Sequence, residues 1–275
     1  MSSIDISPLF IGGLGNRLYQ LAYALTLADL GGYPKIVVHP LTDRVKHIIT
    51  KQLQGMLMKK EDMDENGGHP FDMKLQDAFC IDMGSEQYDG DVVAILESSK
   101  RAMELQSLHT HNNGVIYLIG YYFNYTYVRY VLDRGLFPLW QPNLRFPSVD
   151  GPVIHLRFGY TYDNFPPLFN ISDSVHRVLS IFERHDTSKW TILTNDALQI
   201  PECILSRAGA VYDGAAAGVY AALNMGSRAT VLVMSNSTLS AWMAYLGPID
   251  RVVYCPREFV NQHGSAVVAP NWHMF

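Results

Sequence analysis

The residues best suited to chemistry in this sequence stand where predicted strands end. The stretch Val153–Tyr160, VIHLRFGY, carries His155 and Arg157 near the end of an apolar strand, and strand alternation puts both on one face. An arginine there is always charged and can bond two phosphate oxygens at once. The stretch therefore predicts a phosphate clamp. The alternatives are a salt bridge between domains for Arg157 and a hydrogen-bonded core position for His155.

A glycine turn at residues 12–17, GGLGNR, joins the strand-like run 9–11 to a helical pattern. Gly13 and Gly15 match part of the dinucleotide fingerprint, but Leu18 replaces its third glycine, which disfavours NAD binding. Asn16 and Arg17 open an otherwise apolar helix. Backbone N–H groups, an amide and a guanidinium at this point suit an anionic or hydroxyl-rich ligand. The alternative is a sharp corner that holds no ligand.

A third polar stretch, Ser235–Thr238, lies between the predicted strand 229–234 and the predicted helix 239–245. Ser237 or Thr238 suits the N-cap position of that helix. Helix-start N–H groups and hydroxyls would also form an anion site for a diphosphate. The stretch alone does not decide between these roles.

The order of the predicted elements favours an α/β fold with two Rossmann-like domains, because strands alternate with helices along the chain. Prolines gather between residues 137 and 152 and predict a linker, which gives domains 1–147 and 148–275. We expect a ligand cleft between the domains, at the carboxyl ends of the strands. The predicted strands are 35–39, 92–96, 115–119, 153–157, 190–194, 210–212, 229–234 and 252–254, and further helices are expected at 175–183 and 215–225.

Composition excludes some classes of function. The chain has 275 residues, a net charge of -5 and 48% hydrophobic residues, so a nucleic acid is not an expected partner. Three widely spaced cysteines fit neither a disulfide framework nor a metal site and favour a reducing compartment. The start of the sequence has no signal-peptide pattern, and no apolar run is long enough to span a membrane, so we expect a cytoplasmic protein.

Six stretches together resemble glycosyltransferase family 11, the α-1,2-fucosyltransferase-like enzymes, and more distantly the wider fucosyltransferase superfamily. Their order and spacing agree over nearly the whole chain. They are Gly12–Arg17 (G-G-L-G-N-Q in the family), Tyr117–Tyr122 (Y-L-x-G-Y-[WF]), His155–Tyr160 (H-x-R-R-G-D), Leu193–Asp196 (F-S-D-D), Ser235–Trp242 (S-N-S-T-F-S-W-W) and Val267–Trp272 (V-I-A-P-x-x-W-[FY]).

The resemblance implies a GT-B fold, with two Rossmann-like domains facing a central cleft and the donor GDP-fucose bound mainly by the second. It implies transfer of L-fucose to a hydroxyl of a glycan acceptor, with inversion, without a metal ion and without a cofactor. The first domain is expected on the acceptor side. A bacterial or virus-encoded enzyme, in the latter case in the host cytosol, fits this description.

The resemblance also implies roles for single residues. Arg157 would grip the donor diphosphate, and Asn16 would lie by the diphosphate or the reacting centre as a catalytic residue. Asp163 is our candidate for the base that takes the acceptor proton, with a solvated loop carboxylate as the alternative. The other predicted donor-site residues are Gly13, Gly15, Arg17, His155, Gly159, Asp196, Ser235, Asn236, Ser237 and Thr238.

The sequence departs from the family at three positions. Phe158 stands for the second arginine of H-x-R-R-G-D, Tyr160 for its aspartate, and Arg17 for the glutamine of the glycine turn. Arg17 could replace in space the cation lost at Phe158. These changes leave two further readings open: a different donor, such as another GDP-hexose, or a protein that binds a nucleotide sugar or glycan without catalysis.

Overall fold

The computed structural model divides into two compact units, Met1–Gln141 and Pro142–Phe275, with the boundary inside the proline-rich stretch. We call them unit 1 and unit 2. Of residues 4, 82–83, 91–96 and 171–174 the backbone alone is described. The residues that the structure describes are 4–10, 12–32, 36–39, 43–44, 47, 82–83, 91–96, 114–137, 149, 151–158, 171–185, 189–213 and 218–275.

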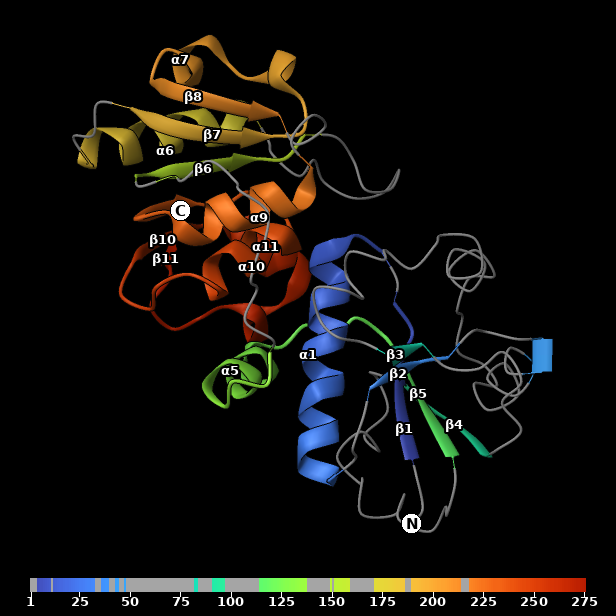
Figure 1. Cartoon of the computed structure of the whole chain (residues 1–275). Coiled ribbons are helices and arrows are strands. Elements are labelled where there is room, and N and C mark those ends of the chain that lie inside the picture. Colours follow the sequence, from blue (N-terminus) through green and yellow to red (C-terminus); the bar gives the residue numbers. More distant parts are fainter. Residues whose placement is uncertain are drawn as a thin grey trace. The chain divides into compact units, whose positions relative to one another are not determined.

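Unit 1 is built on parallel strands, and its central sheet has the order β1-β5-β4. β2 and β3 pair in parallel beside it, and an isolated bridge joins Ile36 to Ile6 of β1. Figure 1 shows the long helix α1 beside these strands. The elements are β1 (Ile4–Pro8), α1 (Leu14–Gly31), β2 (Val37–Val38), β3 (Asp82–Met83), β4 (Asp91–Leu96), β5 (Gly114–Ile119) and α5 (Tyr125–Asp133).

The strand-like interpretation of the run at 9–11 is wrong at Leu9 and Phe10, because β1 ends at Pro8, and Ile11 lies outside the described residues. The Leu9 N–H still bonds to the Leu118 carbonyl at 2.9 Å, and the chain then leaves the sheet. Leu9 and Phe10 are buried, so their apolar character reflects packing beyond the strand. Gly12 then takes a φ of +74°, which L side chains rarely adopt, and this turn leads the chain into α1.

Unit 2 contains a parallel sheet of six strands in the order β11-β10-β9-β6-β7-β8. The strands are β6 (Val153–Leu156), β7 (Trp190–Thr194), β8 (Ala208–Asp213), β9 (Val231–Val233), β10 (Val252–Cys255) and β11 (His273–Met274). The helices are α6 (Ile171–Arg184), α7 (Glu202–Leu205), α9 (Val219–Arg228), α10 (Thr238–Tyr245) and α11 (Arg257–His263), with 3-10 turns at Ala197–Gln199 and Ser265–Val267.

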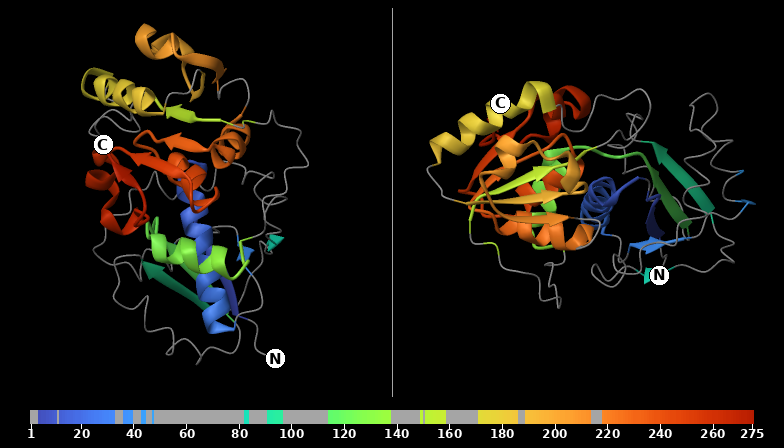
Figure 2. Two further views of the ribbon diagram at one scale, coloured as in Figure 1. Left: turned by 90° about the vertical axis from the view of Figure 1, so that its left-hand side faces the viewer. Right: turned by 90° about the horizontal axis from the view of Figure 1, so that it is seen from above.

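The two faces of this sheet are covered differently. Ile154 and Leu156 of β6 pack with Ile181 of α6 in one core cluster, so α6 covers their face, and Figure 1 and Figure 2 show α6 running alongside the strands. His155 points to the opposite face, where it contacts α10. The predicted α/β class with two Rossmann-like units is confirmed. The central cleft of a GT-B fold stays a prediction.

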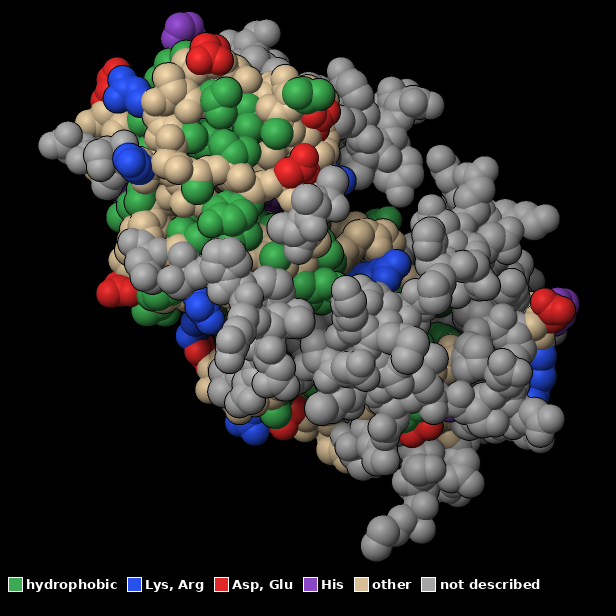
Figure 3. Space-filling view, turned by 45° about the horizontal axis from the view of Figure 1, so that its top comes forward, with side chains coloured by type: hydrophobic (Ala, Val, Ile, Leu, Met, Phe, Trp, Pro, Cys, Tyr) green, Lys and Arg blue, Asp and Glu red, His purple; other side chains and the backbone are tan. Residues whose placement is uncertain are grey.

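Apolar side chains also reach the surface of unit 2. Figure 3 brings the end of the unit with α7 and β8 forward and shows hydrophobic side chains gathered there. Leu198, Leu205 and Val211 are exposed in this region of the chain. Exposed apolar side chains of this kind are common on proteins, and we attach no function to them.

Several boundaries differ from those predicted. β6 ends at Leu156, so Arg157 follows the strand, and α6 starts earlier than residue 175. α9 begins at Val219 rather than at residue 215. The sequence analysis did not predict β11 or α11. Such elements are short or lack a clear apolar period, which is the signal that sequence patterns provide.

Candidate functional site

His155 forms the centre of a buried polar cluster at the carboxyl end of β6. Its Nδ1 lies 2.5 Å from the Ser240 hydroxyl and 3.3 Å from the Ser235 hydroxyl. The Ser235 N–H donates to the Ser240 oxygen at 3.3 Å, and the two serine hydroxyls lie 3.1 Å apart. The cluster ties β6 to the end of β9 and the first turn of α10.

The imidazole of His155 is neutral at physiological pH. Burial lowers its pKa to about 3, and the neighbouring Arg157 guanidinium acts in the same direction. A buried imidazole that is neutral needs no counter-charge. The predicted alternative of a satisfied core histidine therefore describes its surroundings well, and its role toward a donor stays a prediction.

Arg157 supplies the positive charge at this edge of the sheet. It is half-buried, and burial lowers the pKa of its guanidinium without removing its charge at neutral pH. No hydrogen bond or ion pair joins the guanidinium to any residue in the described part of the chain. Taking a cation partly out of water is costly unless a partner compensates it. This position is therefore suited to an incoming anion.

Two backbone bonds fix the chain just beyond Arg157. The Phe158 N–H donates to Asn195 Oδ1 at 2.7 Å, and Asn195 Nδ2 donates to the Phe158 carbonyl at 3.2 Å. The Phe158 ring is buried in the core cluster on the α6 face. A phenylalanine at this position therefore packs the core, on the face opposite to that of His155.

The start of α10 lies on the same face as His155. Ser237 is its N-cap residue, but the Ser237 side chain forms no cap hydrogen bond. Asn236 is buried and donates through Nδ2 to Gln262 Oε1 at 2.7 Å, while its Oδ1 has no partner within the described structure. N–H groups at a helix start and a vacant amide oxygen can together receive an anion and a hydroxyl.

Asp196 has a local structural role. Its Oδ1 accepts the Leu198 N–H at 3.1 Å and its Oδ2 accepts Gln199 Nε2 at 2.6 Å, so it caps the 3-10 turn Ala197–Gln199. These bonds account for the aspartate without a ligand. Its predicted contact with the nucleotide stays a prediction.

The glycine turn of unit 1 holds itself together. Arg17 Nε donates to the Gly12 carbonyl at 2.8 Å, and a Cβ at Gly12 would lie 2.5 Å from Asn16 Nδ2. Gly13 is the N-cap residue of α1, and Gly15 is buried in its first turn. The alternative interpretation of this turn, a sharp corner that holds no ligand, accounts for Gly12 and Arg17.

The structure brings together one part of the predicted site. His155, Arg157 and Ser235–Thr238 meet at one edge of unit 2, whereas Asn16 and Arg17 belong to unit 1. Gly159 and Asp163 lie outside the described residues. Sequence reasoning missed the bonding of Asn195 and Gln262. Asn195 lies in the stretch Leu193–Asp196, so its polar role could have been expected from the sequence. Nothing in the sequence marks Gln262.

Other kinds of site find no support among the described residues. No group of His, Cys, Asp and Glu side chains in that part of the chain is arranged to hold a metal ion. None of the helices described there combines the length and apolar character that a bilayer crossing requires.

Comparisons with known proteins give little guidance. No protein-family model matches the chain, and the search of curated proteins finds no match. Among solved structures, the ADP-heptose lipopolysaccharide heptosyltransferase II of E. coli is similar over 100% of this chain and 90% of its own, with 11% sequence identity and a TM-score of 0.38. A likeness of this size carries no argument about function.

Proposed function

We propose that the chain is a glycosyltransferase whose donor is a nucleoside diphosphate sugar, in first place GDP-fucose, and whose acceptor is a hydroxyl of a glycan. The observation that carries the proposal is Arg157, a half-buried cation without a partner in the described structure, at the carboxyl end of β6. The nearby start of α10 adds backbone N–H donors on the same face. The six family-11-like stretches support the choice of fucose.

The reaction requires these groups to receive negative charge. The acceptor oxygen attacks the anomeric carbon from the face opposite the leaving group, so the configuration inverts. The bond from that carbon to the diphosphate oxygen breaks, and its electron pair leaves with the diphosphate. Arg157 and the N–H groups of α10 would stabilise that charge without a metal ion. The acceptor proton would pass to a base, for which Asp163 remains our candidate.

Two alternatives keep the same diphosphate site. Phe158 and Tyr160 replace charged residues of the family pattern, so a different GDP-hexose is the second candidate donor. The same two replacements favour a third candidate, a protein that binds a nucleotide sugar but does not transfer the sugar.

A donor panel tests the proposal. Purified protein is incubated with GDP-fucose, GDP-mannose, UDP-glucose and UDP-galactose, in EDTA, with a glycan mixture as acceptor, and release of the nucleoside diphosphate is measured. We expect release from GDP-fucose that Arg157→Ala abolishes. If the nucleoside diphosphate is released from a different nucleotide sugar only, that compound replaces GDP-fucose as the donor. If the protein binds a nucleotide sugar but releases no nucleoside diphosphate, the non-catalytic alternative holds. If Asp163→Ala keeps near-normal turnover, Asp163 is not the base.

A further inference from the structure

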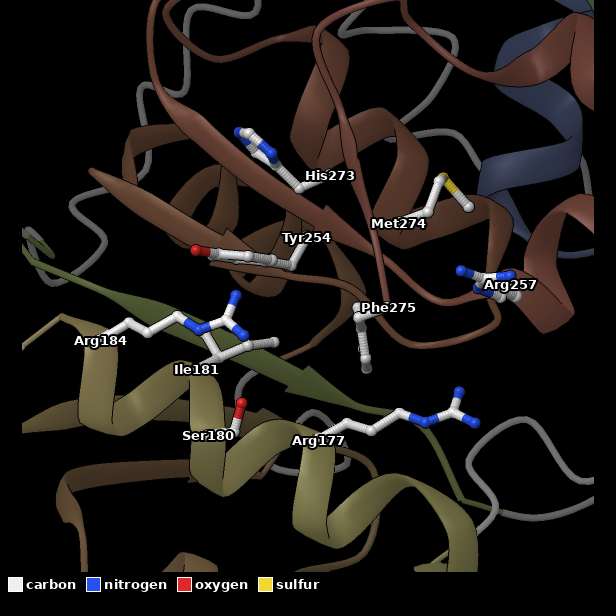
Figure 4. A pocket seen from close by; sticks show the side chains of 9 residues that line it. All are labelled: Arg177, Ser180, Ile181, Arg184, Tyr254, Arg257, His273, Met274 and Phe275. Atoms are coloured by element: carbon white, nitrogen blue, oxygen red, sulfur yellow. The ribbon is translucent and has the colours of Figure 1, made fainter.

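Unit 2 contains a second basic feature, a pocket of about 720 Å³ between α6, the edge strand β11 and its neighbour β10. Figure 4 shows arginine side chains entering it from both sides, from α6 below and from the start of α11. The residues that line the pocket are Arg177, Ser180, Ile181, Arg184, Tyr254, Arg257, His273, Met274 and Phe275.

The helix period explains why α6 presents two arginines here. Arg177 and Arg184 are seven residues apart, so they lie on one face of α6, about 10 Å apart along its axis. Ile181 lies between them and packs into the core cluster, which fixes that face of the helix toward the sheet. Arg257 stands at the first position of α11 and completes the set from the other wall.

Part of the positive charge of the pocket has no close partner among the described residues. Arg177 Nη1 lies 3.9 Å from Glu258 Oε1, a long ion pair between two exposed side chains. The guanidinium groups of Arg184 and Arg257 form no hydrogen bond or ion pair with any described residue. The aromatic rings of Tyr254 and His273 also line the pocket, and their centroids lie 5.5 Å apart. Tyr254 is held in place by a 2.9 Å hydrogen bond to His185.

This pocket is separate from the candidate diphosphate site. Tyr254 and Ile181 belong to the core cluster of Ile154 and Leu156, on the α6 face of the sheet. Strand alternation puts His155 on the opposite face, where it bonds to α10. The pocket therefore does not share its lining with that site.

We propose that this pocket binds a small ligand with two or more phosphate groups. Guanidinium groups bond two phosphate oxygens at once, and three of them line this pocket, which favours a ligand with several anionic groups. The inference does not rest on the proposed transferase activity, because it uses other residues on the other face of the sheet.

The test uses tripolyphosphate as the probe, titrated calorimetrically into the full chain carrying Arg157→Ala, in 150 mM NaCl. This background removes the predicted clamp of the diphosphate site. We expect binding that the double change Arg184→Gln and Arg257→Gln weakens at least tenfold, since each guanidinium is a charged donor. The double change Arg207→Gln and Arg228→Gln, at two exposed arginines of unit 2, is the charge-matched control and should retain the affinity.

Thermal unfolding confirms that each variant is folded, which is expected because Arg184, Arg207, Arg228 and Arg257 are exposed and Arg157 is only half-buried. Three results would overturn the proposal. They are no binding of tripolyphosphate in the Arg157→Ala background, an unchanged affinity in the variant Arg184→Gln and Arg257→Gln, and an equal loss in the control variant Arg207→Gln and Arg228→Gln, which would indicate general charge attraction.

Discussion

Acidification should destabilise unit 2 through His155. This side chain is 4% exposed, its Nδ1 lies 2.5 Å from the Ser240 hydroxyl, and its burial holds it neutral in the folded protein. Its pKa falls from 6.5 to about 3, mainly through burial and then through Arg157. In the unfolded chain the imidazole regains its ordinary pKa and binds a proton below pH 6.5. The unfolded state therefore binds more protons between the two values, and stability falls as the pH falls.

The size of the effect follows from the pKa shift. Each pKa unit corresponds to about 1.4 kcal/mol, so His155 alone should lower the free energy of unfolding by about 3 kcal/mol between pH 6.5 and pH 4. More than about one pH unit above 6.5 the residue is essentially neutral in both states and contributes almost no pH dependence. Burial also lowers the pKa of His263, to about 4, so the chain contains a second group that acts in the same direction.

A matched variant isolates the contribution of His155. His155→Gln retains an acceptor for Ser240 but cannot titrate, while His263 remains in both proteins. Urea unfolding is followed by tryptophan fluorescence, because Trp190, Trp242 and Trp272 lie in unit 2. Between pH 6.5 and pH 4 the wild type should lose about 3 kcal/mol more than the variant. His176→Gln, an exposed change on α6, serves as control.

Parallel pH profiles for the wild type and His155→Gln, offset by a constant free energy, would refute the reasoning. That result would mean that the imidazole is already charged in the folded protein, or that water reaches it.

Two further predictions concern buried groups. Arg251 donates to the carbonyls of Gly226 (2.8 Å), Ser227, Ala229 and Met243, and its burial lowers its pKa to about 10. Arg251→Met should therefore lower the free energy of unfolding by about 3 kcal/mol, measured by urea unfolding, and a loss below about 0.5 kcal/mol would contradict this role. Burial, with a smaller effect of Glu258, raises the pKa of Cys255 to about 12, whereas Cys203 is exposed. Iodoacetamide at pH 8 should label Cys203 in the native protein and Cys255 only after denaturation, as read by peptide mass spectrometry.

The sequence predicted the parallel sheets well, because buried parallel strands appear as continuous apolar runs. β7 (Trp190–Thr194) has the predicted bounds, and β5 differs by one residue. The same signal failed at Leu9 and Phe10, which are apolar and buried but lie beyond the end of β1. Apolar runs report burial, and burial alone does not separate a strand from a packed loop.

The candidate site was predicted in part. His155 was placed on the strand and Ser235–Thr238 at a helix start, as the structure has them, whereas Arg157 follows β6 instead of ending it. The bond between His155 and Ser240 spans 85 positions, and that between Asn236 and Gln262 spans 26. Contacts at such separations depend on the order of strands in the sheet, which residue spacing does not contain.

The most direct test of the central claim is a calorimetric titration of GDP, UDP and GDP-fucose into the wild type and into Arg157→Ala, with and without EDTA. Arg207→Ala, a change at an exposed arginine of unit 2, is the charge-matched control. We expect micromolar binding of GDP that EDTA leaves unchanged and that Arg157→Ala weakens by about 10- to 100-fold, as the loss of charge-assisted hydrogen bonds implies. An equal affinity in the wild type and Arg157→Ala, or no binding of any of the three compounds, would contradict the claim that Arg157 holds a nucleoside diphosphate.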